Sequence, residues 1–375
     1  MTLIGVKTPQ ATVAVCRHHF RHRLSRAAKA ADSVDGPWQA RKDAEYCECS
    51  RPETQVVSPT ASSASKALSD TRALVTGASG FLGTHLCQRL LVERAEVHAV
   101  SRSPRRSRDR DGLHWWQCDF VDPAAVHDLI GRLKPDVVFH FGGMVTAAPD
   151  LALVAPTFHT LLASTVNLLT AVTDVGGGRV VLSASLEEPT NGAADRLVPE
   201  SPYAAAKLAA GAYARMFVKL YDTPVVSLRP FMAYGPGQNP TKIIPYTILC
   251  LLRGDAPQLS SGERALDWVY VEDVIDAFLA AASRSGVEGR TLDLGWGTAV
   301  RIRDVIDRVS RLVDPSITLR YGALPDRPDV RTRVADADAT TAALGWRPTT
   351  SLDRGLAHTV EWYRQSLETV ERNGA

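Results

Sequence analysis

The sequence predicts an α/β fold with a doubly wound parallel sheet, and three observations support this prediction. From residue 71 onward, short runs rich in β-branched residues alternate with longer amphipathic runs. The first of the short runs passes directly into three glycines, Gly77, Gly80 and Gly83. Leucines at helical spacing follow these glycines. Alternation of this kind places helices on both faces of a parallel sheet.

Six strands are expected, in chain order, before this alternation weakens. They lie at Arg72–Thr76, Glu96–Ser101, Trp115–Cys118, Val137–His140, Arg179–Ser183 and Val225–Arg229. After Arg229 the pattern becomes less regular, and loops rich in Pro and Gly follow at 234–237 and 254–262. We therefore expect the sheet mainly within residues 71–230 and a smaller C-terminal substrate-binding lobe mainly within residues 231–375.

Composition excludes several classes of function. The chain has 375 residues and a net charge of only +2, so we expect no nucleic-acid and no membrane partner. No apolar run is expected to reach the roughly 18 residues that a spanning helix needs. The six cysteines form no disulfide framework, which favours a reducing, cytoplasmic environment. Their spacing does not indicate a metal site, and none is expected.

Residues 1–70 differ in composition from the rest of the chain. The first 31 residues carry six basic side chains and no acidic one, and residues 58–69 are rich in Ser, Thr, Pro and Ala. An Arg-rich, acid-poor start is typical of an organelle-targeting segment. The alternative, which we favour, is a disordered N-terminal tail, translated from an upstream start codon.

The three glycines indicate a phosphate cradle between a strand and a helix. Gly77 would permit the tight turn, Gly80 would let the backbone approach a pyrophosphate, and Gly83 would let the helix pack on the strand. The N–H groups of Phe81, Leu82 and Gly83 open the helix and have no partner within it. Such a helix end attracts anions, so these residues predict a dinucleotide site.

The end of the second strand bears on which dinucleotide is bound. An acidic residue there would bind the ribose 2′-hydroxyl of NAD, but the chain has Ser101 and Arg102 instead. These side chains could accept a 2′-phosphate, which favours NADP over NAD as the NAD(P) cofactor. Asp119, after the third strand, could hydrogen-bond the adenine edge or cap the helix expected to begin near Pro123.

Tyr203 and Lys207 are the strongest candidates for chemistry. They are four residues apart in Ser201-Pro-Tyr-Ala-Ala-Ala-Lys207, so a helix would present both on one face. A nearby ammonium would stabilise a phenolate and bring the pKa of Tyr203 toward neutral pH. A hydroxyl after the fifth strand could bind the same substrate oxygen. Ser185 is favoured for this role over Ser183.

With these motifs, the chain from about Arg72 to its C-terminus resembles the NAD(P)-dependent epimerase/dehydratase family. This family belongs to the extended short-chain dehydrogenases/reductases and modifies nucleotide sugars. The matching motifs are Gly77-x-x-Gly-x-x-Gly83, Lys134-Pro-Asp-Val-Val-Phe-His140, Ser201-Pro-Tyr-x-x-x-Lys207, Arg229-Pro-Phe-Met-Ala-Tyr-Gly-Pro-Gly237, Asp267-Trp-Val-Tyr-Val-Glu-Asp273 and Leu344-Gly-Trp-Arg-Pro348.

The resemblance implies a modified Rossmann fold and an NAD(P)-dependent enzyme, with hydride transfer through a keto-sugar. Tyr203 would be the acid/base, Lys207 its electrostatic partner, and both would contact the cofactor, while Ser185 would hold the sugar hydroxyl. Arg264 and Arg327 would bind the substrate. The resemblance also implies a homodimer that pairs through the Tyr203 helix.

Glu187 bears on the type of reaction. Relatives that carry out 4,6-dehydration or decarboxylation have a Glu two residues after the hydroxyl residue, so Glu187 could remove a proton from a 4-keto sugar. The chain departs from the family at Met232 and Leu266, where the family's residues help hold the substrate diphosphate, and at Leu161, where Asn is frequent. An NADPH-dependent reductase of the same superfamily, favoured by the end of the second strand, and a non-catalytic NADP-sensing protein remain alternatives.

Overall fold

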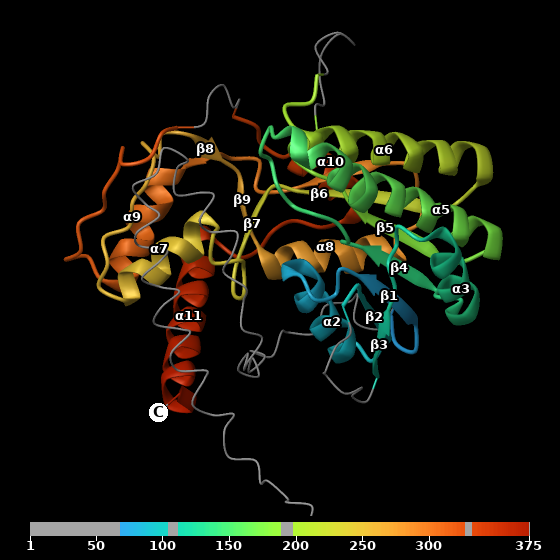
Figure 1. Ribbon diagram of the computed structural model, residues 1–375, viewed down its shortest axis with the longest axis horizontal. Coiled ribbons are helices and arrows are strands. Elements are labelled where there is room, and N and C mark those ends of the chain that lie inside the picture. The colour runs from blue at the N-terminus through green and yellow to red at the C-terminus, as the bar shows by residue number, and fades with distance from the viewer. Residues whose placement is uncertain (1–67, 104–111, 189–197, 327–331, 375) are drawn as a thin grey trace, which may run out of the picture. The chain divides into compact units, whose positions relative to one another are not determined.

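The computed structural model describes residues 68–103, 112–188, 198–326 and 332–374 (Figure 1). These residues belong to one compact unit of the chain. The expected tail, and with it the choice between a targeting segment and a disordered extension, lies outside them except for its last three residues. Of these three, Leu68 is buried in the hydrophobic core, so the folded part of the chain has begun by this residue.

A seven-stranded parallel sheet forms the centre of the fold, in the order β10-β6-β5-β4-β1-β2-β3. Its strands are β1 (Arg72–Thr76), β2 (Glu96–Ser101), β3 (Leu113–Gln117), β4 (Val137–His140), β5 (Arg179–Ser183), β6 (Val225–Pro230) and β10 (Thr291–Leu294). The chain runs outward from β1 through β2 to β3 and then returns to β4 beside β1. This reversal confirms the predicted doubly wound, Rossmann-like sheet.

Two details of the predicted sheet were wrong. The third strand begins at Leu113 and ends at Gln117, two residues and one residue earlier than expected. The seventh strand, β10, was not predicted, although it pairs with β6 from Thr291↔Ser227 onward. It has only four residues, of which Leu292 and Leu294 are buried, so its apolar signal is too short to stand out in the sequence.

Helices cover both faces of the sheet (Figure 1). Helices α2 (Phe81–Val92) and α8 (Val271–Ser283) contribute to one hydrophobic cluster. Helices α3 (Pro123–Leu133), α5 (Ser164–Val175) and α6 (Pro202–Tyr221) contribute to the other.

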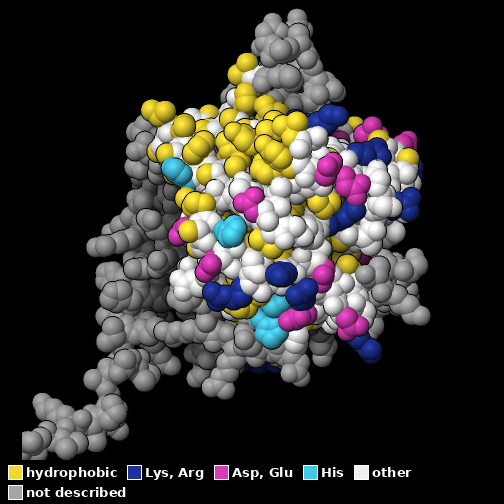
Figure 2. Space-filling view, turned by 90° about the vertical axis from the view of Figure 1, so that its right-hand side faces the viewer, with side chains coloured by type: hydrophobic (Ala, Val, Ile, Leu, Met, Phe, Trp, Pro, Cys, Tyr) yellow, Lys and Arg dark blue, Asp and Glu magenta, His cyan; other side chains and the backbone are white. Residues whose placement is uncertain are grey.

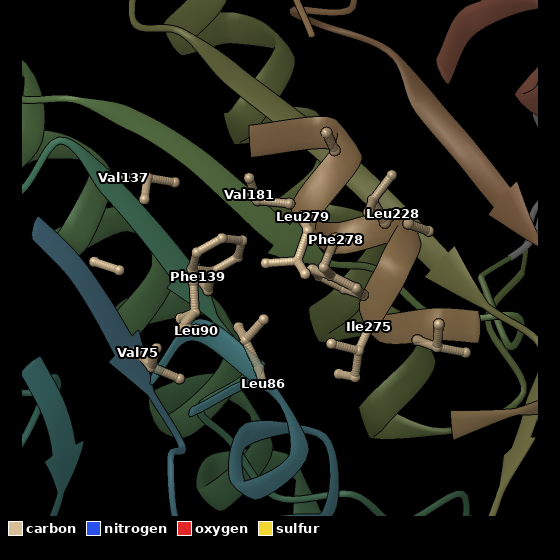
Figure 3. Close-up of a cluster of buried hydrophobic side chains, with 14 of the residues drawn as sticks. Val75, Leu86, Leu90, Val137, Phe139, Val181, Leu228, Ile275, Phe278 and Leu279 are labelled. Carbon is tan, nitrogen blue, oxygen red and sulfur yellow. The ribbon is translucent and has the colours of Figure 1, made fainter. Parts of the chain in front are cut away.

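Successive strand residues point to opposite faces, and this alternation builds both clusters. On β1, Val75 packs against the α2 and α8 side, whereas the adjacent Leu74 packs against the α3, α5 and α6 side. Figure 3 shows the first cluster, in which Phe139 of β4 lies near Leu86 and Leu90 of α2. The adjacent Leu74 and Val75 are both fully buried, one on each face of the sheet. Burial on both faces explains why the strands read as continuous apolar runs.

An unusually apolar helical stretch precedes the fifth strand. It comprises a 3-10 turn η3 (Leu151–Leu153), a short α4 (Val154–Thr157), a π-helical η4 (Phe158–Ala163) and α5. Leu151–Val175 is long and apolar enough to cross a membrane by composition, contrary to the sequence-based expectation. In this fold, Leu168, Leu169 and Val172 pack against the sheet, while 28% of the apolar window is buried.

The C-terminal residues form a third hydrophobic cluster. It draws on α7 (Ile243–Leu252), α9 (Ile302–Val313) and α11 (Leu352–Gly374). Two small sheets pair β7 (Met232–Tyr234) with β9 (Trp268–Tyr270), and β8 (Ala265–Leu266) with β11 (Val300–Arg301).

The C-terminal residues are not confined to this third cluster. Helix α8 and strand β10 pack in the core of the main sheet, and so does the end of α10 (Ala337–Leu344). The chain therefore returns to the sheet twice after residue 231. The face of the sheet that packs against α2 and α8 is therefore covered by segments that are far apart in the sequence.

Replacement of Phe139 by Ala tests the central packing. Because Phe139 is completely buried on a central strand, Phe139→Ala should lower the free energy of unfolding by about 3–5 kcal/mol. Denaturant titration followed by circular dichroism measures this loss. The control is Val92→Ala, since Val92 is 51% exposed at the end of α2 and should change the stability by less than about 0.5 kcal/mol. Equal losses in both variants would contradict the packing described.

Candidate active site

The glycine turn between β1 and α2 is closed by the backbone itself. The Gly80 N–H donates to the Gly77 carbonyl at 2.9 Å, and Gly77 has φ of +64°, which favours glycine. A Cβ atom on Gly83 would lie only 2.2 Å from the Gly77 oxygen, so no larger residue fits there. Gly77 and Gly83 are therefore required by geometry rather than by loop flexibility.

The start of α2 is suited to a pyrophosphate. Among the described residues, no side chain caps this helix, and the intrahelical bonding begins with the Thr84 N–H, which donates to the Gly80 carbonyl at 2.9 Å. The N–H groups of Phe81, Leu82 and Gly83 therefore point out of the helix toward the turn. These residues fit the phosphate groups of a dinucleotide, as the sequence predicts.

The neighbouring strands bring two further predicted positions to the same edge. Strands β1, β2 and β3 are parallel, so the residues that follow them lie at one edge of the sheet. Ser101 ends β2, and its hydroxyl donates to the Ser103 carbonyl at 2.5 Å, while the Arg102 side chain is exposed. Asp119 follows β3 and is exposed, and its carboxylate accepts the Val121 N–H at 3.1 Å.

Asp119 does not cap α3. The helix begins at Pro123, as expected, but the N-cap is Asp122, whose carboxylate accepts the N–H groups of Ala124 and Ala125 at 3.0 and 3.2 Å. Asp119 lies three residues before Asp122, which is about one turn too far from the helix start to cap it. Its carboxylate therefore lies at the sheet edge, outside the helix cap.

Helix α6 carries Tyr203 and Lys207. Ser201 caps this helix by accepting the Ala204 N–H at 3.1 Å, and Pro202 occupies the first turn, where its missing N–H costs nothing. Tyr203 is buried, and the Lys207 ammonium donates to the Ser183 carbonyl at the end of β5, at 2.6 Å. The cap thus fixes the start of the helix and brings both side chains to the carboxyl edge of β5.

The protein's own groups raise the pKa of Tyr203. Burial is the main cause, and the carboxylates of Glu188 and Glu187 add to it, whereas a hydrogen bond from the Ser185 side chain lowers the pKa. The side chains of Ser185 and Tyr203 are therefore close enough for one to affect the other. Ser183 instead engages Lys207 through its carbonyl, and its hydroxyl is directed to the Ala184 carbonyl at 3.5 Å.

The ammonium of Lys207 remains protonated near neutral pH, although its pKa is lowered. Its side chain is only half-buried by area, but the surroundings of the ammonium remove water from it, and this lowers its pKa to about 8. The Glu188 carboxylate opposes the shift. Lys207 is therefore a cation at pH 7 that lies close to losing its proton.

His140, at the end of β4, is neutral and fixed in one tautomer. Burial and the charge of Lys207 lower its pKa to about 3. The Thr165 hydroxyl donates to the Leu161 carbonyl at 2.6 Å, so its contact of 3.2 Å with His140 Nε2 makes Nε2 the donor. Nδ1 is then the acceptor, and the Thr76 hydroxyl donates to it at 2.8 Å. His140 thereby links β1 to α5.

The predicted Glu187 lies in the turn that follows β5. It is partly buried, its N–H donates to the Ser185 Oγ at 3.2 Å, and its carboxylate is close enough to raise the pKa of Tyr203. The adjacent Glu188 is buried, because the turn directs its side chain inward.

The predicted substrate arginines are less well defined by the fold. Arg264 is half-buried directly before β8, and its carbonyl accepts the Ile302 N–H at 3.0 Å. Arg327 lies outside the described residues. Sequence reasoning missed Arg333, whose guanidinium donates to the carbonyls of Leu186 and Glu188 in the turn after β5. No local motif marks such a contact, since 145 residues separate Arg333 from Glu188 in the sequence.

Comparison with known proteins identifies the class of this enzyme. Residues 73–295 match the model of the NAD dependent epimerase/dehydratase family. A UDP-glucose 4-epimerase of Mycolicibacterium smegmatis is 29% identical, with 79% of this chain and 100% of the relative covered. A probable dTDP-glucose 4,6-dehydratase of Sinorhizobium fredii is 30% identical, with 79% of this chain and 93% of the relative covered.

Among solved structures, MoeE5 in complex with UDP-glucose and NAD is 30% identical with a TM-score of 0.69, and 79% of this chain and 99% of MoeE5 are covered. The chain therefore belongs to the NAD dependent epimerase/dehydratase family, whose members are enzymes of the extended short-chain dehydrogenase/reductase type. The resemblance found in the sequence is confirmed.

The glycine turn provides a test of the cofactor site. Gly83→Ala forces a backbone shift against Gly77, so it should weaken NAD(P) binding by roughly ten- to a hundredfold. Isothermal titration calorimetry measures the affinity. Gly131→Ala is the matched control, because Gly131 lies inside α3 and Ala favours a helix. A Cβ added at Gly131 would have Val175 Cγ2 as its nearest neighbour, at 3.9 Å. Unchanged affinity in a folded Gly83→Ala variant would contradict the cradle.

Proposed function

We propose that this protein is an NAD(P)-dependent nucleotide-sugar epimerase or 4,6-dehydratase that acts through a keto-sugar. The observation that carries the proposal is the meeting of Ser185, Tyr203 and Lys207 at the carboxyl edge of β5. The glycine cradle follows β1 at the same edge of the sheet. The names of two relatives, a UDP-glucose 4-epimerase and a probable dTDP-glucose 4,6-dehydratase, support this class of reaction.

In this proposal each of the three residues has one task. Tyr203 takes the proton of the sugar hydroxyl and later returns it. Ser185 holds the same oxygen, and its hydrogen bond stabilises the phenolate form of Tyr203. Lys207 contributes a positive charge beneath the site. The nicotinamide cofactor supplies the hydride acceptor when bound, and its positive ring would lower the pKa of Tyr203 further.

Glu187 decides between the two reactions. Its carboxylate lies near Tyr203 and is partly buried, so it is suited to remove a proton from a carbon next to a keto group. A 4,6-dehydratase requires such a base, whereas an epimerase does not. Glu187 therefore favours the dehydratase.

Two further features of the ligands are proposed. Ser101 and the exposed Arg102 at the end of β2 favour a 2′-phosphate, and hence NADP over NAD, with Asp119 at the adenine edge. The relative MoeE5 is described in complex with NAD, so this chain would differ from it in cofactor choice. Arg264 and Arg327 would bind the diphosphate of the nucleotide sugar. We further propose a cytoplasmic location, in line with the cysteine pattern.

Tyr203→Phe tests the proposed chemistry. Because the variant keeps the ring but loses the proton-transferring hydroxyl, turnover should fall by roughly 10²–10⁴-fold while NAD(P) affinity stays unchanged. Tyr221→Phe is the control, since Tyr221 is 53% exposed at the far end of the same helix. Turnover of Tyr203→Phe that equals that of the unaltered protein would remove Tyr203 from the mechanism.

The assay for this test also identifies the reaction. The protein is incubated with UDP-glucose or dTDP-glucose and with NAD or NADP, and the products are analysed by chromatography and mass spectrometry. A dehydratase yields a product lighter by one water, and an epimerase yields an isomer of unchanged mass. Net consumption of NADPH with a keto-sugar would instead support the reductase. Binding of NADP without turnover of any sugar would support a cofactor-sensing protein.

We also propose that the protein is a homodimer. Apolar side chains gather on the side of the molecule where α5 and α6 lie (Figure 2). Val145, Leu151, Val154 and Phe158 belong to the helical stretch and the loop before it, and are 67, 86, 48 and 49% exposed. An apolar face of this kind on a soluble enzyme indicates a partner surface. A second copy of this chain fits it, since the same stretch also packs against α6 at its inner side.

Charge introduced into this face should separate the dimer. Leu151→Glu combined with Phe158→Glu should convert a dimer into a monomer in sedimentation velocity, because two like charges would meet across the interface. Val92→Glu, on the exposed end of α2, should leave the dimer intact. A monomer in the unaltered protein would overturn the proposal, and co-flotation with lipid vesicles would assign the face to a membrane.

A further inference from the structure

The turn that carries Ser185 is closed by reciprocal hydrogen bonds. The Glu188 N–H donates to the Ser185 carbonyl at 3.1 Å, and the Ser185 N–H donates to the Glu188 Oε1 at 2.6 Å. The Glu187 N–H donates to the Ser185 Oγ at 3.2 Å. The Ser185 Oγ therefore accepts from the turn itself, and its own proton remains available to donate. The conformation of the turn therefore sets the direction of the Ser185 hydroxyl.

The Glu188 side chain is held on two sides. It is only 4% exposed, and its Oε2 lies 3.9 Å from Nη2 of Arg229, which also binds Asp293 at 2.7 Å. The guanidinium of Arg333 donates to the Glu188 carbonyl at 2.7 Å. A buried carboxylate of this kind is stable only where cations and donors surround it. The turn after β5 is thus tied to β6, to β10 and to the segment before α10.

These contacts separate Glu188 from Glu187 in function. Glu187 is partly exposed beside Tyr203, whereas both oxygens of Glu188 face the protein interior. A cavity of about 20 Å³ beneath the site is lined by Glu188, Lys207 and Gly211, and it has room for about one water molecule. Glu188 is therefore buried, with its carboxylate engaged by the Ser185 N–H rather than exposed beside Tyr203.

We propose that Glu188 is a positioning residue of the active site, which aims the Ser185 hydroxyl at Tyr203 and ties the catalytic turn to the C-terminal segment through Arg229 and Arg333. This inference rests on the proposed function for its consequence in catalysis. Its structural part, the control of Ser185 and Tyr203, does not depend on the identity of the sugar.

The charge of Glu188 also acts on both titrating groups. Its negative field raises the pKa of Tyr203 and that of Lys207. The groups that face it are Arg229 on β6, Asp293 on β10 behind that arginine, Arg333, the adjacent Glu187, and Tyr203 and Lys207 on α6. Loss of the charge should therefore lower both pKa values, because the carboxylate stabilises the Lys207 ammonium and destabilises the Tyr203 phenolate.

Two replacements of Glu188 separate its charge from its hydrogen bond. Glu188→Gln keeps an oxygen that can accept the Ser185 N–H, so only the charge is lost and the pKa of Tyr203 should fall. Glu188→Ala loses both, so Ser185 is no longer held, and the pKa of Tyr203 should lie above that of the Gln variant. With Ser185→Ala in the background, the two replacements should give the same Tyr203 pKa.

The pKa is measured by NMR titration of the full chain with ¹³Cζ-labelled tyrosine, with Tyr203→Phe identifying the signal. Glu361→Gln is the control, since Glu361 is exposed on α11 and pairs with Arg364. A Tyr203 pKa that is the same in the unaltered protein, in Glu188→Gln and in Glu188→Ala would overturn the inference. This measurement needs no turnover, so it stands even where UDP-glucose and dTDP-glucose are both rejected.

Turnover of UDP-glucose or dTDP-glucose supplies the second measurement. Glu188→Ala should lower kcat by roughly 10–100-fold with little change in KM, because the turn and not the substrate contacts is disturbed. Glu188→Gln should keep most of its kcat but move its pH profile to lower pH. The acid limb follows Tyr203 deprotonation and the alkaline limb follows loss of the Lys207 proton. An unmoved profile in Glu188→Gln would contradict the proposed role.

Discussion

The burial of the central sheet on both faces is the constraint on which the rest of the structure depends. Leu74 and Val75 are adjacent in β1, and both are fully buried in different hydrophobic clusters. A strand in this position cannot turn back on itself through a tight hairpin, because each face must first be covered by a helix. All strands therefore run in one direction, and every loop that follows a strand opens at the same edge.

This shared edge gathers polar groups that the sequence disperses over more than a hundred residues. The glycine turn follows β1, the neutral His140 ends β4, and Ser185 follows β5. His140 and Ser185 are buried beside an apolar core, where an unpaired polar atom would cost free energy. His140 accepts from the Thr76 hydroxyl and donates to Thr165, and Lys207 donates to the Ser183 carbonyl, so these hydrogen bonds offset that cost. They also fix the site before any ligand arrives.

The site is thus more rigid on the cofactor side than on the substrate side. On the cofactor side the contacts are between backbone atoms, as in the approach of Gly83 to Gly77. On the substrate side the catalytic turn depends on long side chains, in particular Arg229 and Arg333, that reach it from β6 and from the C-terminal segment. Family relatives that differ in substrate would be free to change these side chains without disturbing the cradle.

The sequence by itself determined the sheet, the glycine turn and the spacing of Tyr203 and Lys207, because each depends on residues close together in the chain. Short runs rich in β-branched residues, a glycine turn between strand and helix, and an i, i+4 pair on a helix are all local signals. It did not reveal β10, which is short and recognisable only by its pairing with β6. The buried role of Glu188 was also hidden, since its neighbour Glu187 has the same side chain and the opposite environment. Only the tertiary structure decided between them, because the partners that make burial of Glu188 possible, Arg229 and Arg333, come from distant parts of the chain.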